Sequence, residues 1–265
     1  MLFWTRNSRI AVWTVFAVVV LVVFALPIAT VVLAGFAGSW TGPLPSDLGV
    51  AHFGDAMSGD NVASLAVSLQ TAIIAGAGAL ILGTWAAIAA RHAAGPIRRI
   101  VDGAFHLPIA LPSVVIGLGL LISFNSRPLL LGGTKWIVIV AHTVLVLAFA
   151  FSAVSAALER LDPAYQQAAE SLGASGYRVL TRITLPLLLP ALGAAAGLAV
   201  ALSMGELGAT VMVYPATWKT LPVTIFGLSD RGQVFSAAAC TTILLATTLV
   251  ALIGLGSIRS RASAR

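Results

Sequence analysis

The sequence has very little charge. Of its 265 residues only 9% are aspartate, glutamate, lysine or arginine, whereas 59% are hydrophobic and the mean hydropathy is +1.01. Soluble domains carry about 25% charged residues, so this chain could not cover itself with a surface compatible with water. The composition excludes a soluble enzyme, a secreted domain and a disordered regulator, and it indicates an integral membrane protein.

Groups that perform catalysis or bind metals are scarce too. The single cysteine, Cys240, has no partner for an intrachain disulfide, and the histidines do not gather with cysteines in the spacing of a metal site. The sequence contains no glycine loop ending in Gly-Lys-Ser or Gly-Lys-Thr, and no Ser/His/Asp set or pair of carboxylates in one plausible pocket. We therefore expect no enzymatic activity, no metal and no cofactor, with any ATP hydrolysis in a separate subunit.

The sequence contains several long apolar runs. A membrane-crossing helix needs roughly 20 apolar residues, and hydropathy predicts six such spans. They lie at about 10–35, 64–90, 103–124, 136–157, 187–212 and 234–257. Pro108 and Pro112 in the third span and Pro190 in the fifth predict kinks, because neighbouring helices can satisfy the freed backbone groups. The first run is much longer than the apolar part of a cleaved signal peptide, so we expect it to be retained as a span.

Positive charge is distributed unevenly between alternate loops. Eleven of the 15 lysines and arginines fall on one side of the six spans and four on the other. The positive-inside rule places the first side in the cytoplasm, together with both termini. This bias accounts for the net charge of +6 without nucleic acid as a partner. The longest connection on the cytoplasmic side is 158–186, and a connection of that length usually has a function.

The inner loop 158–186 carries the signals of two short helices. Asp162 is a good N-cap for the first helix, and Gly173 suits the left-handed residue that ends it. Ser175 can cap a second helix, which we expect to run to about Thr184 before the next span opens. Two such helices would form a compact knob that docks on another protein. The alternative is an amphipathic loop that lies on the lipid headgroups, with its arginines on phosphates.

Six residues of this loop have the spacing of a known motif: Ala168, Ala169, Gly173, Ile183, Leu185 and Pro186. With three residues before the glycine, nine before the isoleucine and one before the Leu-Pro pair, they resemble the EAA loop of the permease subunits of ATP-binding-cassette (ABC) importers. The resemblance implies that the loop docks in a cleft of a cytoplasmic ATPase and transmits its closure to the membrane helices. The runner-up class is a secondary transporter or channel that works alone.

The loop departs from the family pattern at one position. The motif's glutamate is replaced by Gln167, and the nearest acidic residue is Glu170, three residues later. Gln167 can donate and accept hydrogen bonds but cannot form a charge-assisted pair with an arginine of the ATPase. Either Glu170 supplies the charge from the same face, or the contact depends mainly on shape.

Two further strings extend the resemblance to the whole chain. LPIALPSVVIGLG at 107–119 and GELGAT at 205–210 are similar to the branch of permeases for molybdate, sulfate, iron(III), thiamine, polyamines and 2-aminoethylphosphonate. The resemblance implies an all-α type I importer permease of about six transmembrane helices, with one domain over 1–265, in the bacterial inner membrane. It implies ATPase subunits, a second permease copy or a similar permease, and an external solute-binding protein as partners. Among the solutes of this branch we favour 2-aminoethylphosphonate or a related phosphonate.

One acidic residue, Glu206, lies deep in a predicted span. A carboxylate at membrane depth costs several kcal/mol unless it is paired or hydrated, so Glu206 is a candidate for the translocation path or gate, together with Ser203 and Gly205. The alternative is structural: the span breaks near Gly205, and Glu206 caps a helix or pairs with Lys219 or Arg231.

The remaining polar residues of the spans favour structural roles. Asp102 and His106 are four residues apart, which predicts a local hydrogen bond on one helix. His142 is isolated, and we expect a neighbouring helix to satisfy it. The glycine-rich stretch that includes Gly76 and Gly83 predicts close packing between helices.

Overall fold

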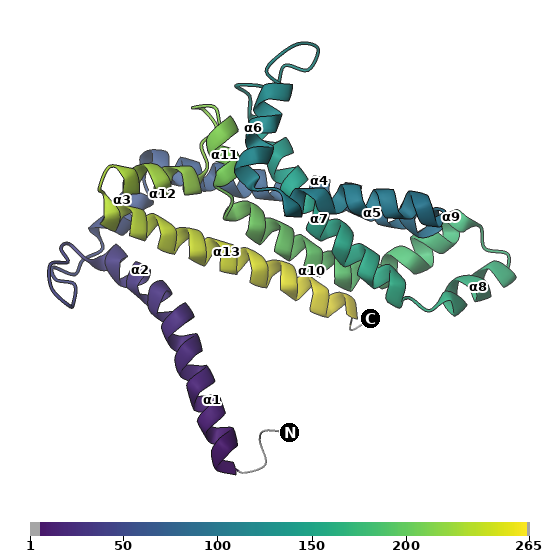
Figure 1. Ribbon diagram of the computed structural model, residues 1–265, viewed down its shortest axis with the longest axis horizontal. Helices are drawn as coiled ribbons and strands as arrows, with labels where there is room; N and C mark the ends of the chain where they lie inside the picture. The colour runs from purple at the N-terminus through teal and green to yellow at the C-terminus, as the bar shows by residue number, and fades with distance from the viewer. Residues whose placement is uncertain (1–5, 264–265) are drawn as a thin grey trace. The chain divides into compact units, whose positions relative to one another are not determined.

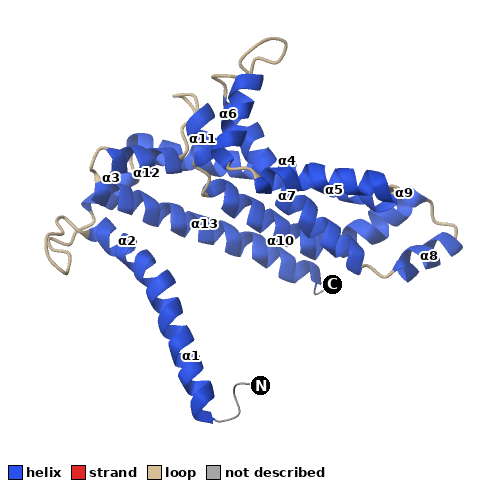
Figure 2. Cartoon of the chain, in the orientation of Figure 1, coloured by secondary structure: helices blue, strands red, loops and turns tan. Residues whose placement is uncertain are grey.

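The computed structural model describes residues 6–263, with side chains described up to residue 255, and the regular elements within that range are all helices (Figure 2). In chain order (Figure 1) they are α1 (Arg6–Val20), a π-helical turn (Leu21–Ala25), α2 (Leu26–Phe36), α3 (Ala51–Ala56), α4 (Gly59–His92), α5 (Gly95–Ala110), α6 (Ser113–Ser123), α7 (Lys135–Arg160), α8 (Pro163–Ser171), α9 (Gly176–Val179), a second π-helical turn (Leu180–Thr184), α10 (Leu185–Met204), α11 (Gly208–Val213), α12 (Leu221–Asp230) and α13 (Val234–Ser263). The two termini, which we predict to be cytoplasmic, lie outside the described residues.

Most of the predicted spans form as continuous helices. Within the described part of the chain, five helical segments are long and apolar enough to cross a membrane: Arg6–Phe36, Gly59–His92, Lys135–Arg160, Gly176–Met204 and Val234–Leu255. They correspond to the first, second, fourth, fifth and sixth predicted spans. The all-α class expected from the sequence is thereby confirmed.

The third predicted span, 103–124, is sharply bent. Its two halves, α5 and α6, meet at an angle of 107°. Leu111 between them is extended (φ −102°, ψ 138°), as is usual for a residue that precedes proline, and Pro112 has no N–H to continue a helix. Pro112 therefore produces the predicted kink, which is large enough that α5 and α6 are separate helices, whereas Pro108 lies inside α5.

The fifth predicted span, 187–212, is wrong at both ends. We expected a short helix to stop near Thr184, but α9, the second π-helical turn and α10 form one continuous helix from Gly176 to Met204. Pro186 follows the π-helical turn, in which the N–H of Leu185 bonds to the carbonyl of Leu180. The wider turn fits a proline that has no N–H for the usual bond, so the helix passes through it without ending. At the other end the helix stops at Met204, and α11 begins only at Gly208.

The chain divides into two compact units, one formed by residues up to 62 with 224–243, the other by 63–223 with residues from 244 onward. In the first unit, α2 is linked to α3 by a loop that Ser39 and Ser46 bridge. The rings of Phe36 and Phe53 lie 4.5 Å apart, centre to centre. Both candidate sites described below belong to the second unit.

The core of the second unit is built around α7. Its side chain Phe151 is fully buried and packs with Ala87 and Ala90 of α4 and with Leu188 of α10. A Cβ added at Gly83 would lie 2.9 Å from the backbone nitrogen of Phe151, so α4 and α7 approach through their backbones. This contact confirms the predicted close packing at Gly83.

Candidate functional site

The first helix of the inner loop forms as the sequence predicts. The Asp162 carboxylate accepts a hydrogen bond of 2.9 Å from the backbone N–H of Ala164, which caps α8. Gly173 follows the end of α8 and has φ +81°, a backbone conformation that is unfavourable for residues other than glycine. Ser175 occupies the predicted N-cap position of α9, but its side chain forms no capping bond there. The loop is therefore a short capped helix joined by a glycine bend to the long helix Gly176–Met204.

The residues of the motif are mostly accessible. Gln167, Ala168, Glu170, Gly173 and Pro186 are exposed, while Ala169, Ile183 and Leu185 are half-buried. Two large side chains beside the motif are also highly exposed, Leu172 at 89% and Tyr177 at 78%. Because both side chains belong to the predicted inner loop, their exposure is compatible with a surface that contacts another protein.

The loop is tied to the base of the long helix. The Gln166 side chain donates a hydrogen bond of 3.3 Å to the hydroxyl of Thr184, which is buried. A cavity of about 250 Å³ lies beneath the loop, and Glu170 and Arg91 are among its lining residues. Figure 1 shows α8 and α9 at one end of α7 and α10, and α11 with α6 at the other. The bond between Gln166 and Thr184 thus joins α8 to the helix that leads to α11.

The second candidate site is the break between α10 and α11, at 205–207. Glu206 lies in this break, and its carboxylate accepts a hydrogen bond of 2.8 Å from the N–H of Ala209 in the first turn of α11. Among the described residues Glu206 forms this cap and no ion pair with Lys219. A break near Gly205 and a capping role for Glu206 are thus both present.

Glu206 also borders a cavity of about 190 Å³ in the middle of the second unit. Ser203 of α10 and His142 of α7 share this cavity with it, and Pro108 and Ile109, at the end of α5, also line it. The His142 ring bonds to Ser203 (2.7 Å) and to Thr210 (2.8 Å). We predicted that a neighbouring helix satisfies His142, and this is confirmed. The sequence did not reveal that the same bonds join His142 to the surroundings of Glu206.

Helix α11, directly after the break, is held against α6 by a close backbone contact. Gly117 of α6 is buried, and a Cβ added there would lie 2.7 Å from the carbonyl oxygen of Ala209. We expect Gly117→Leu to destabilise the protein by about 1–3 kcal/mol, because a larger side chain would force α6 and α11 apart. Thermal unfolding in detergent measures the effect. Gly119→Leu is the matched control, since no atom lies within 4 Å of a Cβ at that position of the same helix. Equal stability of both variants would contradict the contact.

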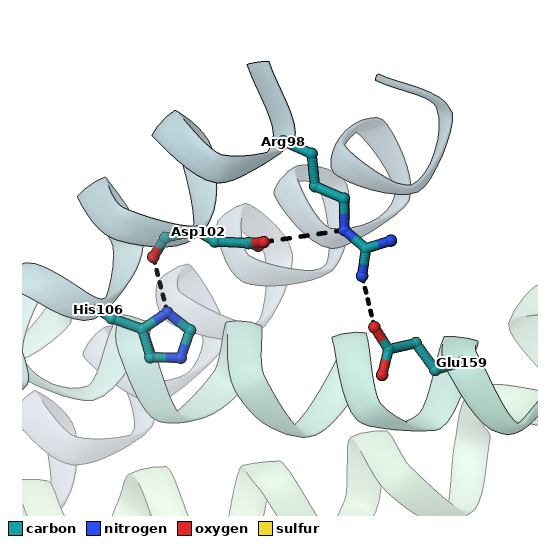
Figure 3. Close-up of polar contacts among 4 residues, drawn as sticks. All are labelled: Arg98, Asp102, His106 and Glu159. Atoms are coloured by element: carbon teal, nitrogen blue, oxygen red, sulfur yellow. Dashed lines mark hydrogen bonds and ion pairs between the residues drawn. The ribbon is translucent and has the colours of Figure 1, made fainter. Parts of the chain in front are cut away.

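A polar cluster lies where α5 meets α7 (Figure 3). Arg98 pairs with Glu159 of α7 and lies 3.8 Å from the carboxylate of Asp102. His106 contacts the backbone oxygen of Asp102 at 2.7 Å, so the predicted local bond exists but uses the carbonyl and not the side chain. Because these charged side chains are largely exposed, their ion pairs contribute little to stability.

Comparison with known proteins places this arrangement among transport proteins. Residues 79–263 match the family described as the binding-protein-dependent transport system inner membrane component. The chain is 43% identical over 261 residues to the putative 2-aminoethylphosphonate transport system permease protein PhnV of Salmonella typhimurium, and the match covers 98% of each chain. It is 34% identical over 173 residues to the molybdenum transport system permease protein ModB of Escherichia coli, covering 60% of this chain and 76% of that one.

Solved structures show the same fold. A bacterial ABC transporter involved in the import of the acidic polysaccharide alginate is similar with a TM-score of 0.71 at 17% identity, covering 96% of this chain and 98% of that one. The MetNI methionine ABC transporter in an inward-facing conformation is similar with a TM-score of 0.63 at 16% identity, covering 76% of this chain and 95% of that one. The family resemblance and the fold expected from the sequence are both confirmed.

Proposed function

The chain belongs to the family of binding-protein-dependent transport system inner membrane components, and from this premise we propose that its solute is 2-aminoethylphosphonate or a closely related phosphonate. As a member of this family it is the permease subunit of a bacterial ABC importer. The observation that carries the solute assignment is the match to PhnV, which spans 98% of both chains at 43% identity. The relative named for sulfate, CysT of Escherichia coli, is 32% identical over 63% of this chain.

The geometry supports a mechanism in which the inner loop is displaced when the ATPase changes conformation during ATP hydrolysis. The exposed motif residues of α8, with Leu172 and Tyr177, provide the docking surface for a cytoplasmic ATPase subunit. Closure of the ATPase would displace α8, and the bond between Gln166 and Thr184 joins α8 to the long helix. That helix ends at the break beside Glu206, so the displacement would reach the cavity that Glu206, Ser203 and His142 line.

The assembly is incomplete with one chain. Each copy carries one docking loop, and importers of this type use two ATPase subunits, so the chain pairs with a second copy or a similar permease. The translocation path would run between the two permeases, and an external binding protein would deliver the solute. Glu206 and Ser203, with Gly205 allowing the break, would lie along that path. Both termini would lie in the cytoplasm, as the charge bias indicates.

Reconstituted uptake tests the proposal. Proteoliposomes that contain the permease with its cognate ATPase subunits, binding protein and ATP should accumulate radiolabelled 2-aminoethylphosphonate, and proteoliposomes without the ATPase should not. Excess unlabelled 2-aminoethylphosphonate should abolish uptake, whereas equal concentrations of molybdate or sulfate should not. Uptake without the ATPase would favour a carrier that works alone. Competition by molybdate or sulfate would contradict the phosphonate assignment and would indicate another solute of the branch.

A further inference from the structure

His142 joins the two helices on either side of the break at 205–207. It belongs to α7, its side chain is 1% exposed, and both ring nitrogens have partners. Nδ1 lies 2.7 Å from the hydroxyl of Ser203, at the end of α10, and Nε2 lies 2.8 Å from the hydroxyl of Thr210, in α11. The imidazole therefore bridges a break in which two backbone bonds of 3.3 Å, from Gly205 N–H to Ala201 and from Glu206 N–H to Ser203, continue α10 but do not reach α11.

The direction of each bond follows from the number of available hydrogens. The Thr210 hydroxyl donates to the backbone carbonyl of Glu206 at 3.3 Å, so its oxygen accepts from Nε2–H of His142. Nδ1 then has a lone pair and accepts from the hydroxyl of Ser203. The resulting chain of bonds runs from Ser203 through a neutral His142 and Thr210 to the backbone of Glu206. Every member is satisfied without a charged imidazole.

A bridge at this point is mechanically important. The helix Gly176–Met204 extends without interruption from the inner loop to the break, about 43 Å at 1.5 Å per residue. A continuous helix transmits a displacement along its length. Beyond Met204 the backbone bonds back to α10 are 3.3 Å long and end at Glu206, so the side-chain bridge through His142 is a further connection to α11. Ser203, His142 and Thr210 are all buried, so moving one away from the others would leave a polar group unpaired in an apolar environment.

We propose that His142 is a positioning residue that passes the displacement of α10 to α11 and so sets the position of the Glu206 carboxylate. The inference rests on the proposed function, because the displacement originates in the ATPase docked on the inner loop. The Glu206 carboxylate is bound to α11 through the N–H of Ala209, so a shift of α11 would move the carboxylate within the cavity.

The test measures solute transported per ATP hydrolysed, in proteoliposomes that contain the complete importer. His142→Phe keeps the ring volume without the two bonds, and Thr210→Val removes one hydroxyl with little change of shape. We expect each to lower the transport-to-ATP ratio by about tenfold, since the loss of a buried hydrogen bond has an effect of that order. His142→Gln retains a donor and an acceptor and should recover part of the ratio. Thr143→Val is the control, because that hydroxyl bonds only to Ile139 of its own helix.

Three results separate the possibilities. An unchanged ratio in both His142→Phe and Thr210→Val would overturn the inference while leaving the proposed function intact. A parallel loss of uptake, ATP hydrolysis and melting temperature, with no recovery in His142→Gln, would show a purely structural residue and would also overturn it. Wild-type uptake that does not need the ATPase would instead refute the proposed function on which the inference rests. If His142→Phe does not assemble, Thr210→Val alone decides between the first two results.

Discussion

Gly173→Leu should reduce uptake by about tenfold to a hundredfold while the permease still inserts and folds. Gly173 has φ +81°, and apart from its two chain neighbours no atom of the described residues lies within 4 Å of the position that a Cβ would occupy. A Cβ at this position would therefore meet no close neighbour within the permease, and the backbone strain costs about 1–2 kcal/mol. A large loss of transport would come from a side chain that stands between α8 and the ATPase, since a disrupted interface centre has effects of this size.

The control for this experiment is Gly232→Leu. Gly232 also has positive φ (+75°) and open space around its Cβ position, but it lies in a loop that we predict to be outside the cell. Both variants should reach the membrane in equal amounts. Co-purification of the ATPase subunit should be weakened in Gly173→Leu and unchanged in Gly232→Leu. Normal uptake and normal ATPase binding in Gly173→Leu would argue against the docking role of the loop.

Glu206→Gln should lower uptake about tenfold or more with little effect on stability. The glutamine can still accept the hydrogen bond from the N–H of Ala209, so the cap of α11 is retained while the charge is removed. A carboxylate at this depth costs several kcal/mol unless it is paired or hydrated. Such a cost is expected for a group that lines a water-filled path, and it is not expected for a group that serves only as a helix cap, because a neutral side chain could do the same. Uptake, with melting temperature measured in parallel, distinguishes these roles.

The comparison with Glu206→Ala makes this prediction specific. Alanine removes both the charge and the cap, and loss of a cap costs about 0.5–2 kcal/mol of stability. If Glu206 only caps α11, Glu206→Gln should behave like the wild type and Glu206→Ala should be less stable. If the carboxylate also lines the path, both variants should transport poorly, and only Glu206→Ala should show the lower melting temperature. Wild-type transport by Glu206→Gln would make the charge dispensable.

Local chemistry explains which parts of the site could be predicted from the sequence. The cap at Asp162 and the left-handed Gly173 depend on a few neighbouring residues, and both form as predicted. Glu206 was identified as a candidate because a charge in an apolar run is rare, and a break near Gly205 was one of the two alternatives considered for it. These features need no knowledge of the tertiary fold.

Other features depend on contacts that a single sequence does not reveal. The prolines predicted a kink in the third span, but not that Gly117 would let α6 pack directly on the backbone of α11. Pro186 suggested the start of a span, yet a π-helical turn carries the helix through it. His142 looked isolated because its partners, Ser203 and Thr210, are more than 60 positions away in the chain.

The measurement that tests the central claim most directly is cross-linking from the exposed residue Gln167. Cys240 is the chain's single cysteine, so Cys240→Ser with Gln167→Cys places one thiol on the inner loop, and Gly232→Cys in the same background places one on the predicted outer side. In inside-out membrane vesicles that contain the importer, a short thiol cross-linker should join Gln167→Cys to the ATPase subunit, and Gly232→Cys should give no such product. The account would be contradicted if Gln167→Cys formed no cross-link to the ATPase and reacted with an impermeant thiol reagent only in right-side-out vesicles.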